Sequence, residues 1–169
     1  MQAINRRQLL TLAAAACGTA LAGCGFRLRG ANLQYPFRSI FIAGAGTAMV
    51  AQLKRLLARQ VQVADAIAHA DVVLTVLLDQ EERTASAFST SAKVREVELL
   101  RRFDFSLADT RGNVLIESAP ITMRRFVSYS EDEATGKEEE FETLLRDMRN
   151  DTAQQVLRRL AAARPAAAQ

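Results

Sequence analysis

The chain has 169 residues, of which 49% are hydrophobic and 24% are charged, and its formal net charge is +3. This length and composition are ordinary for one globular domain with a real hydrophobic core. The small net charge argues against a nucleic-acid partner, and we predict none.

The first 23 residues predict a secretory signal, with a basic start and an apolar run over 9–21. This run is short for a bilayer span, which takes about 20 apolar residues. The tetrad Leu21-Ala22-Gly23-Cys24 at its end resembles a bacterial lipobox. That resemblance implies cleavage before Cys24 and acylation of both the cysteine and the new amino terminus. Ordinary secretory cleavage, for which residues 20–22 offer a site, is the alternative.

Cleavage of the signal changes both the charge and the cysteine content of the chain. Arg6 and Arg7 leave with the signal, which lowers the net charge from +3 to +1. Cys17 leaves as well, so the mature chain keeps no thiol for a disulfide or a thiolate metal site. The paired arginines also permit twin-arginine export, although an ordinary basic start explains them more simply.

The first half of the mature chain predicts a strand, a helix and a second strand. Residues 39–42 form a short apolar run, and a glycine-containing turn follows it. Thr47 is expected to cap a helix that runs to about Gln60. Residues 71–78 carry apolar side chains on both faces, which predicts a central strand covered on each side. The strand–helix–strand order favours a parallel crossover.

The second half predicts two long antiparallel strands. Residues 94–107 alternate between apolar and polar side chains, except that Arg101 falls on the apolar face. A turn over 109–113 leads into a returning strand over 114–129. Pro120 lies within this strand and argues for an edge position or a bulge.

A second helix is expected at the carboxyl end, after an acidic loop over 131–140. It runs from about Lys137 to Leu160, and residues 161–169 are a low-complexity tail that we expect to fray. Its apolar stripe comprises Phe141, Leu144, Leu145, Met148, Thr152, Val156 and Leu160. The same periodicity places four basic residues on the solvent side: Arg146, Arg149, Arg158 and Arg159.

The order strand–helix–strand–strand–strand–helix predicts an α/β fold, of the α+β sandwich type. We expect a four-stranded mixed sheet with two helices packed on it, forming a single domain over 24–160.

No motif in the chain indicates catalysis. His69 lies just before a predicted strand and is expected to be structural or exposed, and one histidine without a free cysteine cannot form the usual zinc sets. Glu81 and Glu139 lie in acidic runs, but a glycosidase needs two facing carboxylates, whereas adjacent ones point apart. We therefore predict a protein that is not an enzyme, without catalytic, metal or cofactor residues.

Basic side chains gather instead on the two long strands: Lys93, Arg95, Arg101, Arg102, Arg124 and Arg125. If these strands pair about the 109–113 turn, the two arginine pairs come near each other. Guanidinium groups can hold phosphate oxygens in bidentate fashion, so such a cluster suits a phosphate-bearing ligand. The alternative is that the interleaved acids neutralise them, namely Glu96, Glu98, Asp104 and Glu117.

Four segments together resemble one protein family in their order and spacing. They are Cys24-Gly25-Phe26-Arg27-Leu28-Arg29-Gly30, Thr84-Ala85-Ser86-Ala87-Phe88, Phe126-Val127-Ser128-Tyr129, and a last segment that runs from Ala134-Thr135-Gly136-Lys137 through Met148-Arg149 and Asp151 to Leu157-Arg158-Arg159-Leu160. With these segments the chain resembles the LptE family, the lipopolysaccharide-assembly lipoproteins of the outer membrane. The resemblance implies a small domain of two helices against a four-stranded sheet.

The resemblance also implies a function and a set of partners. Proteins of this family plug the LptD β-barrel, help it to assemble, and bind lipopolysaccharide on its way to the outer leaflet. Gly25, which is not an aspartate, favours sorting to the outer membrane, where the protein would face the periplasm through its lipid anchor. A lipid-anchored scaffold of another envelope complex, or a periplasmic cell-wall hydrolase, is the alternative.

The family's ligand-binding basic residues lie near a hairpin tip and before the last helix. Lys137 matches the second place, and Lys93 is the nearest basic residue to the first, where this chain has serine and threonine over 89–91. With them, Arg95, Arg124 and Arg125 complete the expected lipopolysaccharide contacts.

Overall fold

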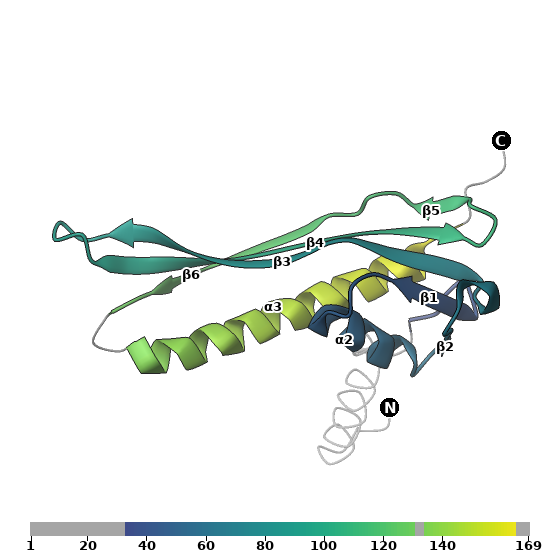
Figure 1. Ribbon diagram of the computed structural model, residues 1–169, viewed down its shortest axis with the longest axis horizontal. Coiled ribbons are helices and arrows are strands. Elements are labelled where there is room, and N and C mark those ends of the chain that lie inside the picture. The colour runs from purple at the N-terminus through teal and green to yellow at the C-terminus, as the bar shows by residue number, and fades with distance from the viewer. Residues whose placement is uncertain (1–32, 131–133, 165–169) are drawn as a thin grey trace, which may run out of the picture. The chain divides into compact units, whose positions relative to one another are not determined.

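The computed structural model describes residues 33–130 and 134–164 of the chain. Within these residues, six strands form one mixed sheet, and the two α-helices lie on the same face of it (Figure 1). The signal and Cys24 fall in residues 1–32, which lie outside the described residues, as do 131–133 of the expected acidic loop and 165–169 of the expected tail. The predicted α+β class is confirmed.

The chain enters the sheet at β1 (Ser39–Ala43) and continues into α2 (Ala48–Leu57). As expected, Thr47 caps this helix: its hydroxyl accepts a hydrogen bond from the backbone N–H of Val50 at 3.2 Å. That bond satisfies one of the donors left free in the first turn of a helix. Four residues of α2 are buried against the sheet: Met49, Val50, Leu53 and Leu57.

After α2 the chain returns through β2 (Gln62–Val63) and the short 3-10 helix η1 (Ile67–His69) to β3 (Val72–Phe88). β1 is parallel to both β2 and β3, so the predicted parallel crossover is confirmed. β2 is too short to leave a periodic pattern in the sequence, and it is one reason why the sheet has six strands and not four.

β3 and β4 (Val94–Asp109) form a long antiparallel hairpin whose register runs from Val72 opposite Asp109 to Phe88 opposite Val94. β3 therefore continues well beyond Leu78, through the polar residues that follow it.

The predicted strand over 114–129 is broken at Pro120 into β5 (Val114–Ile116) and β6 (Ile121–Ser128). Among the described strands both pair with β4 alone, so Pro120 lies at a sheet edge, as expected. The carbonyl of Pro120, like that of Ala119, accepts a hydrogen bond from the guanidinium of Arg159, which holds this break against the last helix.

That helix, α3 (Ala134–Ala162), begins and ends slightly outside the predicted bounds. Much of the expected 131–140 loop is therefore helical. The predicted apolar stripe is confirmed, because all of its residues are buried except Leu144, which is half-buried. The stripe contributes to two clusters of buried side chains, the main core under both helices and a smaller cluster made of Leu99, Val127, Phe141, Leu145 and Met148.

The expectation that β3 is covered on both faces is wrong. α2 and α3 cover one face, which we term the helix-side face, and no described element covers the other, which we term the open face (Figure 1). Apolar side chains remain exposed as a result: Leu77, at a register shift of β3, is 52% exposed and Phe126 of β6 is 58% exposed. Within the described chain, neither helix is at once long enough and apolar enough to cross a membrane.

Candidate functional site

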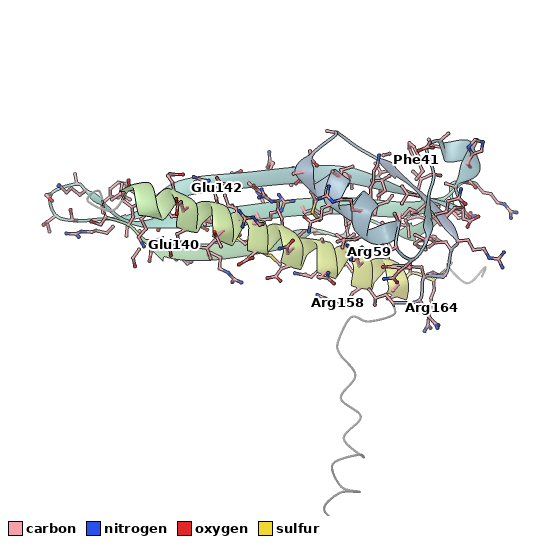
Figure 2. The ribbon with its side chains drawn as sticks, turned by 90° about the horizontal axis from the view of Figure 1, so that it is seen from below. Phe41, Arg59, Glu140, Glu142, Arg158 and Arg164 are labelled. Atoms are coloured by element: carbon pink, nitrogen blue, oxygen red, sulfur yellow. The ribbon has the colours of Figure 1, made fainter. Side chains whose placement is uncertain are left out.

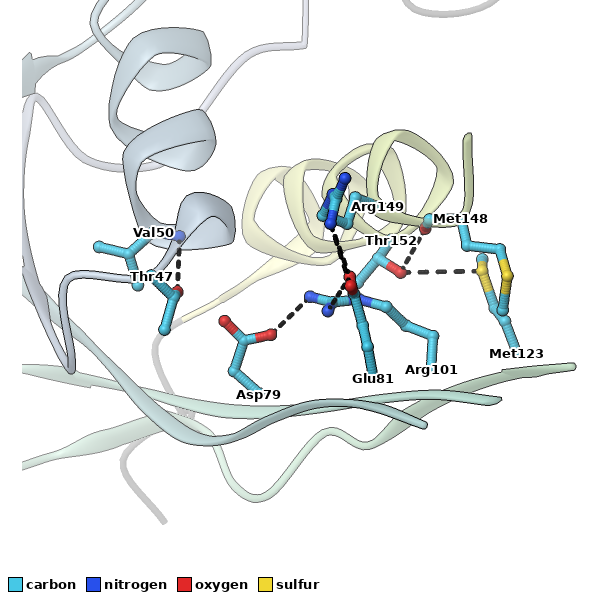
Figure 3. Close-up of polar contacts among 9 residues, drawn as sticks. All are labelled: Thr47, Val50, Asp79, Glu81, Arg101, Met123, Met148, Arg149 and Thr152. Atoms are coloured by element: carbon cyan, nitrogen blue, oxygen red, sulfur yellow. Dashed lines mark hydrogen bonds and ion pairs between the residues drawn. The ribbon is translucent and has the colours of Figure 1, made fainter. Parts of the chain in front are cut away.

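Arg101 is the charge that the sequence placed on an apolar face, and the structure buries it with only 2% of the side chain exposed. Its guanidinium donates to Asp79 at 2.6 Å and to Glu81 at 2.7 Å, both on β3. Glu81 accepts a further hydrogen bond from Arg149 of α3 at 3.0 Å (Figure 3). One carboxylate thus joins β3, β4 and α3, and Arg149 is not the solvent-side residue that helical periodicity predicted.

Two further arginines of the strands, Arg102 and Arg124, are neutralised on the open face. Arg102 pairs with Glu82 across the β3–β4 ladder, and Arg124 of β6 lies 3.4 Å from Glu98 of β4. The alternative of neutralisation by neighbouring acids therefore describes these arginines better than an open phosphate cluster does, and Glu98 is one of the acids expected in that role.

Of the five predicted ligand residues, Arg95 and Arg125 lie on the helix-side face. Arg125 is opposite Leu99 in the β4–β6 register, and Arg95 shares the side of Val97 by strand alternation. Both are exposed and make no ion pair with any described residue. Arg124, next to Arg125 in the chain, points to the opposite face, as the alternation of a strand requires.

Lys93 and Lys137 lie at the same end of the domain as Arg95. Lys93 closes the β3–β4 turn, where its backbone carbonyl accepts from the N–H of Ser89 at 2.7 Å. Lys137 lies in the first turns of α3, 19% exposed, with its ammonium 2.7 Å from Glu140. Figure 1 shows the β3–β4 turn and the start of α3 at the same end of the sheet.

Arg83 fixes the start of α3 at this end. Its guanidinium pairs with Glu138, at 2.8 Å, and with Glu142, and it lies over the ring of Phe141 at 5.5 Å from the centroid. Phe141 in turn stacks on Tyr129, which directly follows β6, with 6.3 Å between ring centroids. Although partial burial acts to lower it, the pKa of Arg83 is raised above its ordinary value by the hydrogen bonds to the two carboxylates.

The structure thus places Lys93, Arg95, Arg125 and Lys137 toward the hairpin end of the domain, and it places Arg124 on the opposite face of the sheet. We term this group of four the hairpin-end cations. That they bind a ligand stays a prediction.

Sequence reasoning did not find a second group of arginines, in the groove between α2 and α3. Arg55 and Arg59 line it from the side of α2, and Arg146 and Arg149 line it from α3. Only the packing of α2 against α3, which Figure 2 shows side by side, brings these arginines together.

The residues considered for catalysis are dispersed. Glu81 turns toward Arg101 on the helix-side face, whereas Glu82 turns toward Arg102 on the open face, so the adjacent carboxylates point apart as expected. His69 is exposed in η1. Within residues 33–130 and 134–164, no three acidic, histidine or cysteine side chains are grouped as a metal site.

The chain was compared with protein families, curated proteins and solved structures. The profile of the LptE family, described as lipopolysaccharide-assembly, matches residues 31–160. No curated protein matches the chain.

Three solved structures are similar to it. The solution structure of uncharacterized lipoprotein B from Nitrosomonas europaea has a TM-score of 0.71 and 28% identity, over 82% of this chain and 91% of that one. A minor lipoprotein from Acinetobacter baumannii has a TM-score of 0.63 and 27% identity, over 80% and 99% of the two chains. Rare lipoprotein B from Shewanella oneidensis shares the fold, with a TM-score of 0.62 and 23% identity over 74% of this chain and 95% of that one.

Proposed function

The chain belongs to the LptE family of lipopolysaccharide-assembly proteins, and from this membership we propose that it is an outer-membrane lipoprotein that plugs the LptD β-barrel, helps it to assemble, and binds lipopolysaccharide. The family match over residues 31–160 is the observation that carries the proposal. The protein has no catalytic role in it.

In this proposal Cys24 carries the lipid anchor and the domain faces the periplasm. Each buried methylene of an acyl chain contributes about 0.8 kcal/mol, so two or more chains hold a protein firmly at a membrane. The anchor places the domain beside a membrane-embedded barrel.

The hairpin-end cations are the proposed contacts for the phosphates of lipopolysaccharide. Arg95 and Arg125 support this role best, because both are exposed and neither is engaged by a described acid. Lys137 must exchange Glu140 for the ligand. Arg124 must release Glu98 and lies on the other face of the sheet, so its contribution is the smallest of the predicted five.

Capture of the barrel tests the main proposal. Outer membranes are solubilised in mild detergent, and the protein is pulled down through a carboxyl-terminal tag. We expect a stoichiometric, heat-modifiable β-barrel of LptD in the eluate. A preparation that contains no barrel overturns the proposal and favours a lipid-anchored scaffold of another envelope complex.

Lipopolysaccharide binding by charge-neutral variants tests the ligand residues. We expect Arg95→Gln with Arg125→Gln to weaken binding about tenfold, because charge-assisted hydrogen bonds to phosphate are lost. Arg111→Gln is the control, since this exposed arginine lies in the turn at the opposite end of β4. Equal binding by all three proteins would remove the hairpin-end cations from the proposal.

The hydrolase alternative gains no support. Glu81, one of its two candidate acids, is bound by Arg101 and Arg149. Asp79, the carboxylate beside it, is held by Arg101 as well.

A further inference from the structure

The groove between α2 and α3 concentrates positive charge. It has a volume of about 480 Å³ and is lined by four arginines, two amides and two apolar side chains: Arg55, Arg59, Arg146, Arg149, Gln52, Asn150, Ala48 and Leu56. None of these lining residues is acidic. We propose that this arginine groove is a binding site for a phosphate monoester group, carried on a sugar or on a lipid headgroup.

Three of the four groove arginines are not neutralised by an ion pair within the described chain. Arg55, Arg59 and Arg146 make no ion pair with any described residue. α2 itself contains no acid, so none of its own side chains can compensate Arg55. Guanidinium groups gathered without counter-charge repel one another, and a bound dianion relieves that repulsion.

Two acids near the groove arginines are engaged elsewhere. Glu142, one helical turn before Arg146, pairs with Arg83 on β3. Glu81 shares its charge between Arg101 and Arg149. The hydrogen bond from Arg149 to Glu81, at 3.0 Å, fixes the orientation of this groove arginine.

A side-chain hydrogen bond links the two helices that line the groove. Gln52 of α2 donates a hydrogen bond to the side-chain oxygen of Asn150 on α3 at 2.7 Å, which ties the two helices together. The amide N–H donors of Asn150 stay available beside the guanidinium groups. Planar guanidinium forks match phosphate oxygens in bidentate fashion, and a volume of this size falls within the range of about 300–1,000 Å³ typical of ligand pockets.

This inference is independent of the proposed function, because the arginine groove shares no residue with the hairpin-end cations. Its affinity for phosphate can therefore fail while the barrel and lipopolysaccharide experiments succeed, and the reverse also holds.

Calorimetry on the full chain in neutral detergent micelles tests it. One titration uses glucose 1-phosphate, and a second uses micelles doped with phosphatidic acid, with phosphatidylcholine as the headgroup control. The double variant Arg55→Gln with Arg146→Gln removes two arginines that support no other contact. Arg158→Gln is the matched control, since Figure 2 shows Arg158 on the side of α3 away from α2.

We expect the double variant to lose at least about tenfold in affinity for the monoester, and Arg158→Gln to stay within about twofold of the unchanged protein. The phosphate monoester that binds in these titrations should also raise the unfolding temperature of the unchanged protein but not of the double variant, since a ligand stabilises only the state that binds it. Circular dichroism verifies that both variants are folded.

The two titrations separate the sources of phosphate. Groove-dependent binding of glucose 1-phosphate supports a soluble or sugar-borne monoester, and groove-dependent binding of phosphatidic acid alone supports a lipid headgroup. Equal affinity for phosphatidylcholine, binding that the double variant retains, or no binding in either titration overturns the proposal.

Discussion

Arg101 of β4 and Asp79 of β3 form a 2.6 Å ion pair on the helix-side face, and Glu81 is the second carboxylate bound to the same guanidinium. Side chains alternate between the faces of a sheet, so a slip of one residue in the β3–β4 register would move Arg101 to the open face. The pair therefore marks the register of the longest hairpin in the described chain.

Removing this cation should cost far more stability than removing its neighbour. We expect Arg101→Met to lower the free energy of unfolding by about 3 kcal/mol, because it strands the carboxylate of Asp79 in a buried position. Arg102→Met on the open face, where the side chain is 42% exposed, should cost less than about 1 kcal/mol. Urea unfolding measures both, and equal losses would contradict the assignment of Arg101 to the interior.

Two phenylalanines on opposite sides of the sheet should also differ in how much stability their replacement costs. Phe141 is 3% exposed within the smaller apolar cluster, so Phe141→Ala should cost about 3 kcal/mol or more. Hydrogen exchange should show the first half of α3 opening most readily in this variant. Phe126→Ala removes a ring that is 58% exposed, and we expect a change of at most about 0.5 kcal/mol. A large loss from Phe126→Ala would indicate that the open face is not free in solution.

The cap at Thr47 gives a smaller and purely local effect. Thr47→Ala should lower the free energy of unfolding by about 1 kcal/mol, since the N–H of Val50 loses its side-chain acceptor. Thr47→Ser keeps that acceptor and should restore most of the stability. If serine and alanine were equally unfavourable, the methyl group and not the hydroxyl of Thr47 would be responsible.

Asp71 should make stability depend on acid pH. Hydrogen bonds from the backbone N–H groups of Arg38 and Ser39 lower the pKa of Asp71 below its ordinary value. A group whose pKa is lower in the folded state stabilises the fold above its unfolded pKa, and this contribution disappears as the pH falls through the folded value. The stability difference between the unchanged protein and Asp71→Asn should therefore shrink between about pH 6 and pH 2. Unfolding measured across that range would refute the idea if the difference stayed constant.

Local patterns in the sequence predict much of this architecture. Thr47 was recognisable as a cap, the stripe of α3 follows from helical periodicity, and Pro120 marked a sheet edge because proline cannot donate to a ladder. What local patterns omit is the assignment of faces. The apolar residues of β3 predicted cover on both sides, and only the placement of both helices on one side shows that Leu77 stays exposed.

The candidate site was less accessible to prediction for the same reason. Arg101 stood out as a charge on an apolar face, but its partners Asp79 and Glu81 lie about twenty residues away on another strand, and a single sequence does not reveal that pairing. The arginine groove depends on contacts between α2 and α3, such as the bond from Gln52 to Asn150 across 98 positions. Helical periodicity could say only that its arginines avoid the core.

The position of α3 after the β3–β4 hairpin in the chain has a consequence for the order of folding. β3 and β4 can pair through a short turn, and contacts between close neighbours in the chain form early. Arg101, Asp79 and Glu81 then keep their water until α3 arrives, because that helix brings Arg149 to Glu81 and covers them. We therefore expect the charges to lose their hydration in the same late step that buries Phe141 and Leu160, so that apolar burial offsets the dehydration of the ion pairs when it occurs.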